Sequence, residues 1–140
     1  MAKITSILAL SFLLIHCGSS SHITQNFEKD AQLIGIWQTL KKDGEVLPYF
    51  RYKVKSLTFD QEALYSIGPN GEKQRKFSWW IEKEQGTKLL TLFVADVGRQ
   101  MLYKIENDTL RIKDFGIGDS IGDKDNLLSS EETLVFFRKQ

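Results

Sequence analysis

The sequence predicts an all-β fold: an eight-stranded, up-and-down antiparallel barrel that follows a signal peptide and a short tether. From Leu33 onward, β-branched and aromatic residues alternate with polar ones, and this period of two is typical of strands. Clusters of Gly, Asn and Asp separate the runs, as expected for turns. Long and short connections also alternate along the chain, which is expected when successive strands run up and down around a barrel.

The first sixteen residues have the layout of a secretory signal peptide. Lys3 precedes an apolar run over residues 7–15, and the only cysteine of the chain, Cys17, follows at its end. The run is well short of the roughly 20 residues that a membrane-spanning helix needs. We therefore interpret residues 1–16 as a leader that is removed.

Cys17 is the candidate lipidation site. Leu14 and Ile15 resemble the bacterial lipobox, but His16 stands where that pattern has a small residue. One prediction is a lipoprotein that is held in the membrane by acyl chains such as palmitate on Cys17. The alternative is an ordinary signal peptide that is cut between Cys17 and Ser20, which leaves a soluble periplasmic or secreted protein.

Composition excludes several classes of function. The chain has 19 basic and 18 acidic residues, and removal of Lys3 with the leader brings the formal net charge to zero. No global charge therefore attracts a nucleic acid. A single cysteine forms no internal disulfide, so packing must stabilise the domain. We expect a monomer without cofactor or metal.

The remaining chain divides into a tether over residues 17–30 and a barrel domain over residues 31–140. Asn26 is a candidate cap for a short helical turn over residues 27–30. The strands follow, and a change of phase in the second of them predicts a bulge near Lys55 and Ser56. The eight predicted strands cover residues 33–41, 50–59, 63–67, 76–83, 88–95, 99–106, 109–114 and 132–139.

The connections predict a barrel with one open and one closed end. Loops near 42–49, 68–75, 96–98 and 115–131 alternate with tight turns near 60–62, 84–87 and 107–108. Alternate connections lie at the same end of an up-and-down barrel, so the long loops share the open rim. The loop after Asp114 has aspartates, but their spacing does not match a calcium-binding EF-hand, and we expect a flexible flap at the rim.

Gly35, Trp37 and Arg138 are predicted to form the barrel floor. The first strand begins and the last strand ends at the closed end, so closure of the barrel brings Trp37 and Arg138 together. The guanidinium could then lie on the indole for roughly 0.5 to 2 kcal/mol. Gly35 would allow the close approach of neighbouring backbone.

These three positions resemble those of the lipocalin superfamily, in particular the short lipocalin-like domains of bacterial lipoproteins. In that family a Gly-x-Trp opens the first strand and a late Arg covers the Trp. The stretch from Tyr103 to Ile112 is similar to a late hairpin of the bacterial group. The resemblance covers Leu33 to Lys139. By resemblance to enteric lipoproteins, Gly18 after the cysteine favours the outer membrane.

The resemblance implies a binding protein of the cell envelope that holds a small hydrophobic or amphipathic ligand in the barrel. The alternative is a filled barrel that binds an envelope protein, as an inhibitor or assembly factor, through its open rim. The candidate ligand-binding wall consists of the aromatic and Met residues on the apolar phase of their strands: Tyr52, Tyr65, Phe77, Trp79, Met101, Tyr103 and Phe136.

Trp80 and His22 are two further residues whose types bear on function. Trp80 must face away from the interior because its neighbour Trp79 faces inward, so it is either a contact for a partner or is covered by a loop or the N-terminal turn. Without its leader, the chain has one histidine, His22, in the tether. Ser-His, Cys-His and His-based zinc sites cannot form, and we expect no enzyme.

Overall fold

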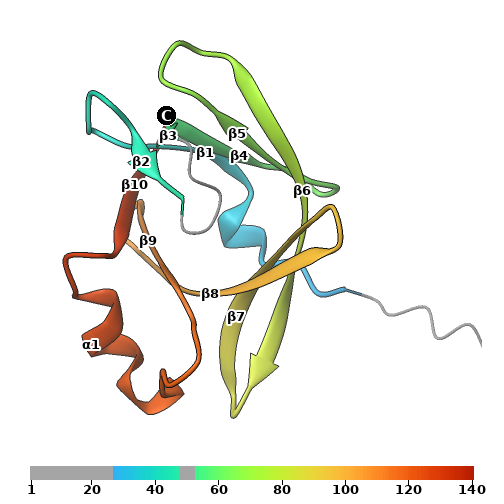
Figure 1. Ribbon diagram of the computed structural model, residues 1–140, viewed down its shortest axis with the longest axis vertical. Coiled ribbons are helices and arrows are strands. Elements are labelled where there is room, and N and C mark those ends of the chain that lie inside the picture. Colours follow the sequence, from blue (N-terminus) through green and yellow to red (C-terminus); the bar gives the residue numbers. More distant parts are fainter. Residues whose placement is uncertain (1–26, 48–52) are drawn as a thin grey trace, which may run out of the picture.

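The computed structural model describes residues 27–47 and 53–140, so the predictions for Cys17 and Tyr52 lie outside the described residues. Eight strands form a closed barrel in which every neighbouring pair is antiparallel, which confirms the predicted fold class (Figure 1). Around the barrel the strands are β1 (Gly35–Gln38), β4 (Ser56–Phe59), β5 (Leu64–Ile67), β6 (Lys73–Glu84), β7 (Thr87–Val94), β8 (Val97–Glu106), β9 (Thr109–Asp114) and β10 (Leu134–Arg138). Contact between β1 and β10 closes it.

Alternating burial along the strands produces the core. In β4, Leu57 and Phe59 are 1% exposed, whereas Ser56 and Thr58, which alternate with them, are half-buried. Such alternation places every second side chain inside the barrel, because successive side chains of a strand point to opposite faces. Val54 is also buried, so the chain changes phase at Lys55 and Ser56. The structure has a bend there, which confirms the predicted irregularity.

The connection from β1 to β4 contains a small second sheet. In it β2 (Glu45–Val46) pairs with β3 (Lys53–Val54), and the two flank residues 48–52. The first strand of the barrel is therefore shorter than the predicted range of 33–41. Its hydrogen bonding ends at Gln38, after which the amide of Thr39 donates to the carbonyl of Lys55, 3.0 Å away.

Three two-residue turns make tight hairpins. Gln85 and Gly86, Ala95 and Asp96, and Asn107 and Asp108 all have positive φ angles between 45° and 78°. Positive φ at both central residues is typical of type I′ turns, whose twist matches that of the flanking strands. The turns at 85–86 and 107–108 lie at the closed end, as predicted.

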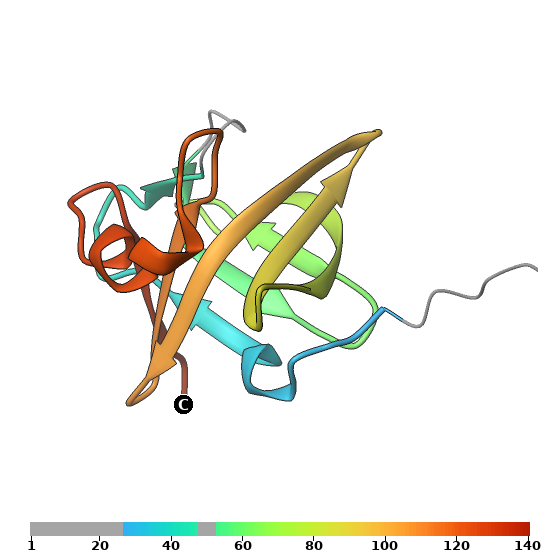
Figure 2. The same ribbon diagram turned by 90° about the horizontal axis from the view of Figure 1, so that it is seen from below.

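The loop after β9 is folded against the barrel, so the predicted flexible flap is wrong. It contains the 3₁₀ turn η2 (Ile121–Asp123) and the helix α1 (Lys124–Leu128), which lies outside the ring of strands (Figure 2). Leu128 is 2% exposed because it packs on Leu89 and Leu102. Burial of this second apolar cluster holds the loop on the outer wall.

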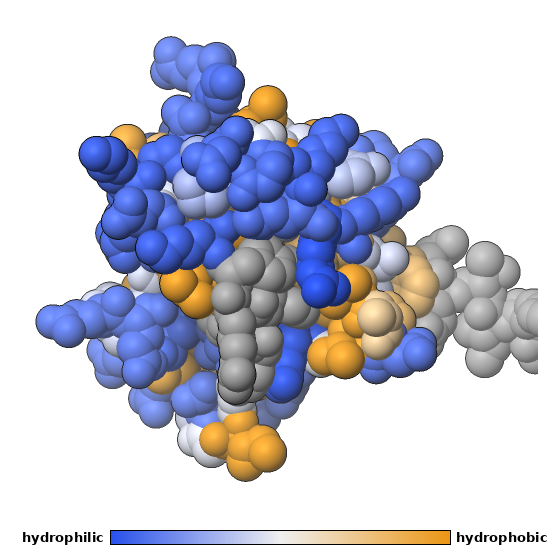
Figure 3. All heavy atoms as spheres, turned by 45° about the horizontal axis from the view of Figure 1, so that its top comes forward, coloured by the Kyte–Doolittle hydropathy of each residue, from blue (hydrophilic) through white to orange (hydrophobic). Residues whose placement is uncertain are grey.

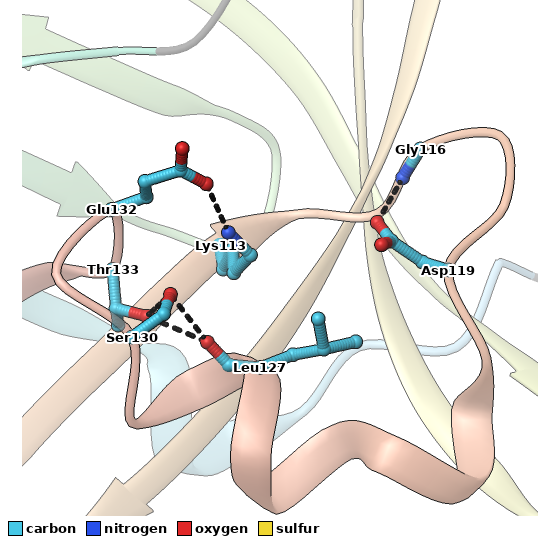
Figure 4. A network of polar contacts seen from close by, with 7 residues as sticks. All are labelled: Lys113, Gly116, Asp119, Leu127, Ser130, Glu132 and Thr133. Atoms are coloured by element: carbon cyan, nitrogen blue, oxygen red, sulfur yellow. Dashed lines mark hydrogen bonds and ion pairs between the residues drawn. The ribbon is translucent and has the colours of Figure 1, made fainter.

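Hydrogen bonds fix the two ends of this loop (Figure 4). At its start the Asp119 carboxylate accepts from the amide of Gly116 at 2.8 Å. At its end the hydroxyls of Ser130 and Thr133 both donate to the carbonyl of Leu127, at 2.8 and 3.1 Å. Asp119, one of the aspartates of this loop, therefore binds backbone. No group of three or more potential metal ligands occurs in the described part of the chain.

Strands β6 and β7 continue past their other barrel neighbours as a two-stranded arm, residues 78–88, which reaches the bottom of the view in Figure 1. Trp79 and Ile81 of this arm still belong to the core cluster. Strand β5 pairs with β6 only as far as Phe77, and β8 pairs with β7 only from Leu89 onward. Among the described strands, none pairs with the arm on either side, and we refer to these two sides as its free edges. These two edges frame the candidate sites described below.

The N-terminal segment, residues 27–34, crosses the closed end of the barrel. Glu28 forms an antiparallel bridge with Ile81 on the free edge of β6, so the predicted helical turn over residues 27–30 is wrong. The only helical turn here is η1 (Ala31–Leu33), and the Asp30 side chain caps it by accepting from the amide of Gln32 at 3.0 Å. The backbone hydrogen bond between Glu28 and Ile81 forms in place of a helical turn over residues 27–30, for which the sequence offers only Asn26 as a cap.

Candidate functional site

Side chains fill the barrel interior. The five largest fully buried residues are aromatic, and each has less than 2% of its surface exposed: Trp37, Phe59, Phe77, Trp79 and Phe136. An internal cavity large enough for water would leave accessible surface on the side chains around it. Phe77, Met101 and Phe136 have none. Of the two alternatives left open by the sequence, the structure favours the filled barrel.

Most residues of the predicted ligand-binding wall are packed core residues. Phe77, Trp79, Met101 and Phe136 belong to one cluster with Tyr103, which is 5% exposed. Their inward orientation agrees with the sequence, and Phe77, Met101 and Phe136 have no exposed surface that a ligand could contact. Tyr52 is outside the described residues.

Tyr65 does not belong to this wall. Its neighbours Leu64 and Ser66 are fully buried, so Tyr65 points out of the barrel. There its ring lies 5.6 Å from Nζ of Lys73 and 5.8 Å from Nζ of Lys76. The pairing of Leu64 with Phe77 sets this orientation, because both face the core. Its predicted place in the interior is wrong.

The predicted barrel floor has the expected geometry. Cζ of Arg138 lies 4.2 Å from the centre of the fully buried Trp37 ring. The guanidinium also donates to the carbonyls of Ile34 at 3.0 Å and Gln32 at 2.7 Å. The indole N–H donates to the carbonyl of Leu33 at 2.8 Å. One cation thus binds the indole face and the turn that precedes β1.

Gly35 makes room for this cation. Its φ is +134°, in a region that residues with a side chain rarely adopt, and a Cβ there would lie 3.0 Å from Nη1 of Arg138. Both the backbone conformation and the space therefore require glycine at this position.

Asp30 and Tyr103 form a polar contact at the closed end. The Tyr103 hydroxyl donates to Oδ2 of Asp30 at 2.7 Å, and Nζ of Lys88 lies 3.5 Å from the same oxygen. Partial burial opposes ionisation of Asp30, but the hydrogen bonds from Tyr103 and Gln32 and the charge of Lys88 outweigh it and lower its pKa. Burial, followed by the contact with Asp30, raises the pKa of Tyr103 above its usual value.

The variant Tyr103→Phe tests this contact. Because it removes a hydrogen bond to a charged group, we expect the free energy of unfolding at pH 7 to fall by about 1.5 to 3 kcal/mol. A lowered pKa stabilises the fold above the unfolded-state pKa and is lost as the pH falls through the folded-state value. In the variant the pKa of Asp30 rises, so acid destabilisation begins at a higher pH. Urea unfolding and NMR titration of the Asp30 carboxyl measure both effects; an unchanged pKa would contradict the assignment.

An aromatic groove lies outside the barrel, beside the free edge of β6. It has a volume of about 530 Å³ and is lined by Phe27, Lys29, Glu62, Trp79, Trp80 and Phe93, among others. Trp80 points outward from β6, and the neighbouring β7 places Phe93 beside it, where Phe93 pairs with Ser78. Phe27 reaches the same place from the N-terminal segment.

The aromatic rings of the groove contact one another. The centres of Phe27 and Trp80 are 4.6 Å apart, and those of Trp80 and Phe93 are 6.2 Å apart. Phe27 is 51% and Phe93 39% exposed, so the cluster is open to solvent. The indole N–H of Trp80 donates to Glu82 at 2.8 Å, which holds the ring in place. In a space-filling view, hydrophobic side chains form patches on a mostly hydrophilic surface (Figure 3).

Polar groups border the groove on the side of Trp79. Nζ of Lys29 lies 4.2 Å from the centre of the Trp79 ring and donates to the Trp79 carbonyl. The Trp79 indole N–H donates to the carbonyl of Asp60 at 3.0 Å. Burial lowers the pKa of Lys29, partly offset by the charge of Asp60. The groove thus combines apolar faces with one ammonium group, that of Lys29, and one carboxylate, that of Glu62.

The sequence identified part of this groove. It predicted that Trp80 faces outward and that an N-terminal segment could cover it, and Phe27 does contact its ring. It missed Phe93, although Phe93 lies on the outward phase of its strand. The pairing of Ser78 with Phe93 brings the two rings together, and that register depends on the turn at 85–86.

Comparison of the chain with protein-family models, with curated proteins and with solved structures found no match. Among the described residues, no helix is both long enough and apolar enough to cross a membrane.

Proposed function

We propose that the protein is a binding protein that takes a small hydrophobic or amphipathic molecule in the aromatic groove. The closed eight-stranded barrel fits a lipocalin-like binding fold. The observation that carries the proposal is the contrast between a filled interior and an exposed cluster of three aromatic rings beside a groove. Large exposed apolar side chains that contact one another are typical of interaction sites.

The dimensions and chemistry of the groove suit such a ligand. Its volume of about 530 Å³ lies in the usual range of small-molecule sites. An aliphatic chain would lie on the faces of Trp80 and Phe93. A polar or anionic head would lie near the ammonium of Lys29, which the Trp79 carbonyl and ring already position.

The proposal includes attachment to the cell envelope through Cys17. Phe27, which lines the groove, follows Cys17 by about ten residues, and a random coil of that length would span roughly 15 to 20 Å. An anchored protein would therefore hold the groove close to the membrane surface. The membrane is a source of amphipathic molecules.

Tryptophan fluorescence tests the groove. Titration with the apolar probe 1-N-phenylnaphthylamine should quench Trp80 and increase probe emission. We expect Trp80→Ala and Phe93→Ala each to weaken binding by about tenfold, since one aromatic contact is worth roughly 1.5 kcal/mol. The matched control is Ile117→Ala, which removes a fully exposed apolar side chain outside the groove. Equal affinity in all three variants, or no binding by the parent protein, would contradict the proposal.

A second candidate function is binding of an extended polypeptide by the free edge of β6. Among the described residues, only Glu28 pairs with this edge beyond Phe77. The amide of Ile81 points to the edge and donates to Glu28 at 2.8 Å, so the amide of Lys83 points the same way. A polypeptide that adds a strand here would protect the Lys83 amide from hydrogen exchange. A small molecule in the groove would leave that amide unprotected.

A further inference from the structure

The opposite edge of the arm borders a second pocket, which we name the lysine pocket. Strands β7 and β8 pair from Val94 and Val97 down to Leu89 and Leu102 and then diverge. Residues 103–106 of β8 therefore have no neighbour on that side among the strands that the structure describes (Figure 2). The gap in the wall is a pocket of about 440 Å³ lined by Asp30, Thr87, Lys88, Tyr103, Lys104 and Lys124, among others.

The charged side chains that line the lysine pocket carry a net positive charge. Three lysines and one carboxylate line it, which is a formal net charge of +2. The carboxylate of Asp30 already accepts hydrogen bonds from Tyr103 and from the amide of Gln32. Glu106 and Asp125, which pair with Lys104, do not line the pocket and are 62% and 86% exposed, so they neutralise it weakly.

Lys124 is the least compensated of the three lysines. It is half-buried at the start of α1, and no carboxylate of the described residues lies within ion-pair distance of its ammonium. Its Nζ lies 5.8 Å from the centre of the Tyr103 ring. Burial lowers the pKa of Lys124, and the nearby charge of Lys104 lowers it further, while the charge of Asp125 partly offsets both.

We propose that the lysine pocket binds the phosphate group of a small organic molecule. A phosphate monoester is close to a dianion at neutral pH and matches the formal charge of the lining. Lys88 and Lys104 lie on the two diverging strands and Lys124 on α1, so lysines from three elements line the same pocket. The Tyr103 ring and the Thr87 hydroxyl are available to the organic part. This site is separate from the aromatic groove and does not depend on it.

The test is NMR titration of the isotopically labelled protein with glycerol 3-phosphate and with inorganic phosphate. We expect shifts of the amides of residues 86–88 and 103–105. Lys124→Gln should weaken binding by about tenfold or more. Lys104→Gln, which changes a residue on the outer face of β8, should also weaken it. The matched control is Lys42→Gln at the opposite rim, which removes the same charge and should change affinity by less than about twofold. A thermal unfolding curve verifies that each variant is folded.

A third titration distinguishes the source of the phosphate. Vesicles of phosphatidylcholine with phosphatidic acid present the same monoester on a lipid. Binding to these vesicles that Lys124→Gln weakens more than Lys42→Gln does would support the site with a lipid headgroup as its ligand. Equal weakening by both variants in every titration, or no binding in any of them, would overturn the proposal.

Discussion

Replacement of Trp37 by alanine is expected to lower the free energy of unfolding by about 3 to 5 kcal/mol, the usual cost of removing a buried large aromatic side chain. Trp37 has no exposed surface, and its indole supports two interactions besides its packing. The N–H donates to Leu33, and the ring face carries the guanidinium of Arg138. Chemical denaturation at pH 7 measures the effect.

Ile36→Ala is the matched control, because Ile36 is the neighbour in the same strand and is 40% exposed. We expect it to cost less than about 1 kcal/mol. A double-mutant cycle of Trp37→Phe with Arg138→Met isolates the contact between the two side chains, with an expected coupling of about 0.5 to 2 kcal/mol. Additive losses would show that Arg138 stabilises the floor through its hydrogen bonds to Ile34, Gln32 and Asp108 and not through the indole.

Phe136→Ala is expected to cost about 3 to 5 kcal/mol and to create an apolar cavity inside the barrel. Phe136 is fully buried in the central cluster, opposite Leu110 of β9. Apolar cavities of this size stay dry and accept small aromatic molecules. The variant should therefore bind benzene, and saturation with benzene should restore part of its stability. Calorimetry and thermal unfolding with and without benzene measure both effects.

The neighbouring Phe137→Ala provides the comparison, because Phe137 points away from the core and is half-buried. It should lose less stability and gain no benzene binding. If the parent protein already bound benzene inside the barrel with the affinity of the Phe136 variant, the interior would contain a cavity and would not be filled.

Local patterns were sufficient to predict the barrel. Apolar and polar residues alternate along the strands and thereby mark the buried and the exposed face. Turns such as Asn107 and Asp108 are recognisable from residue type alone. The floor could also be predicted, since Trp37 and Arg138 lie at the two ends of the strand pattern and closure must join them. The phase change at Lys55 was visible because apolar residues mark the inward face on both sides of it.

Other features depend on tertiary contacts that no local pattern records. In the short strand β5, Leu64 and Ile67 are apolar on opposite faces, so the sequence does not decide whether Tyr65 points inward. Pairing with Phe77 decides it. The helix α1 has only five residues, too few for a periodic pattern, and packing on Leu89 and Leu102 stabilises it. The aromatic groove joins residues as distant in sequence as Phe27 and Phe93.

The seam between β1 and β10 has a consequence for how the chain reaches its native state. It pairs Trp37 with Arg138, so two of the most separated parts of the domain must meet before the ring is complete. Such a high contact order slows folding, because the intervening chain loses conformational entropy before the contacts between β1 and β10 can stabilise the fold. A nascent chain that still lacks its last strand cannot close, and the barrel would therefore stay open throughout synthesis at the ribosome.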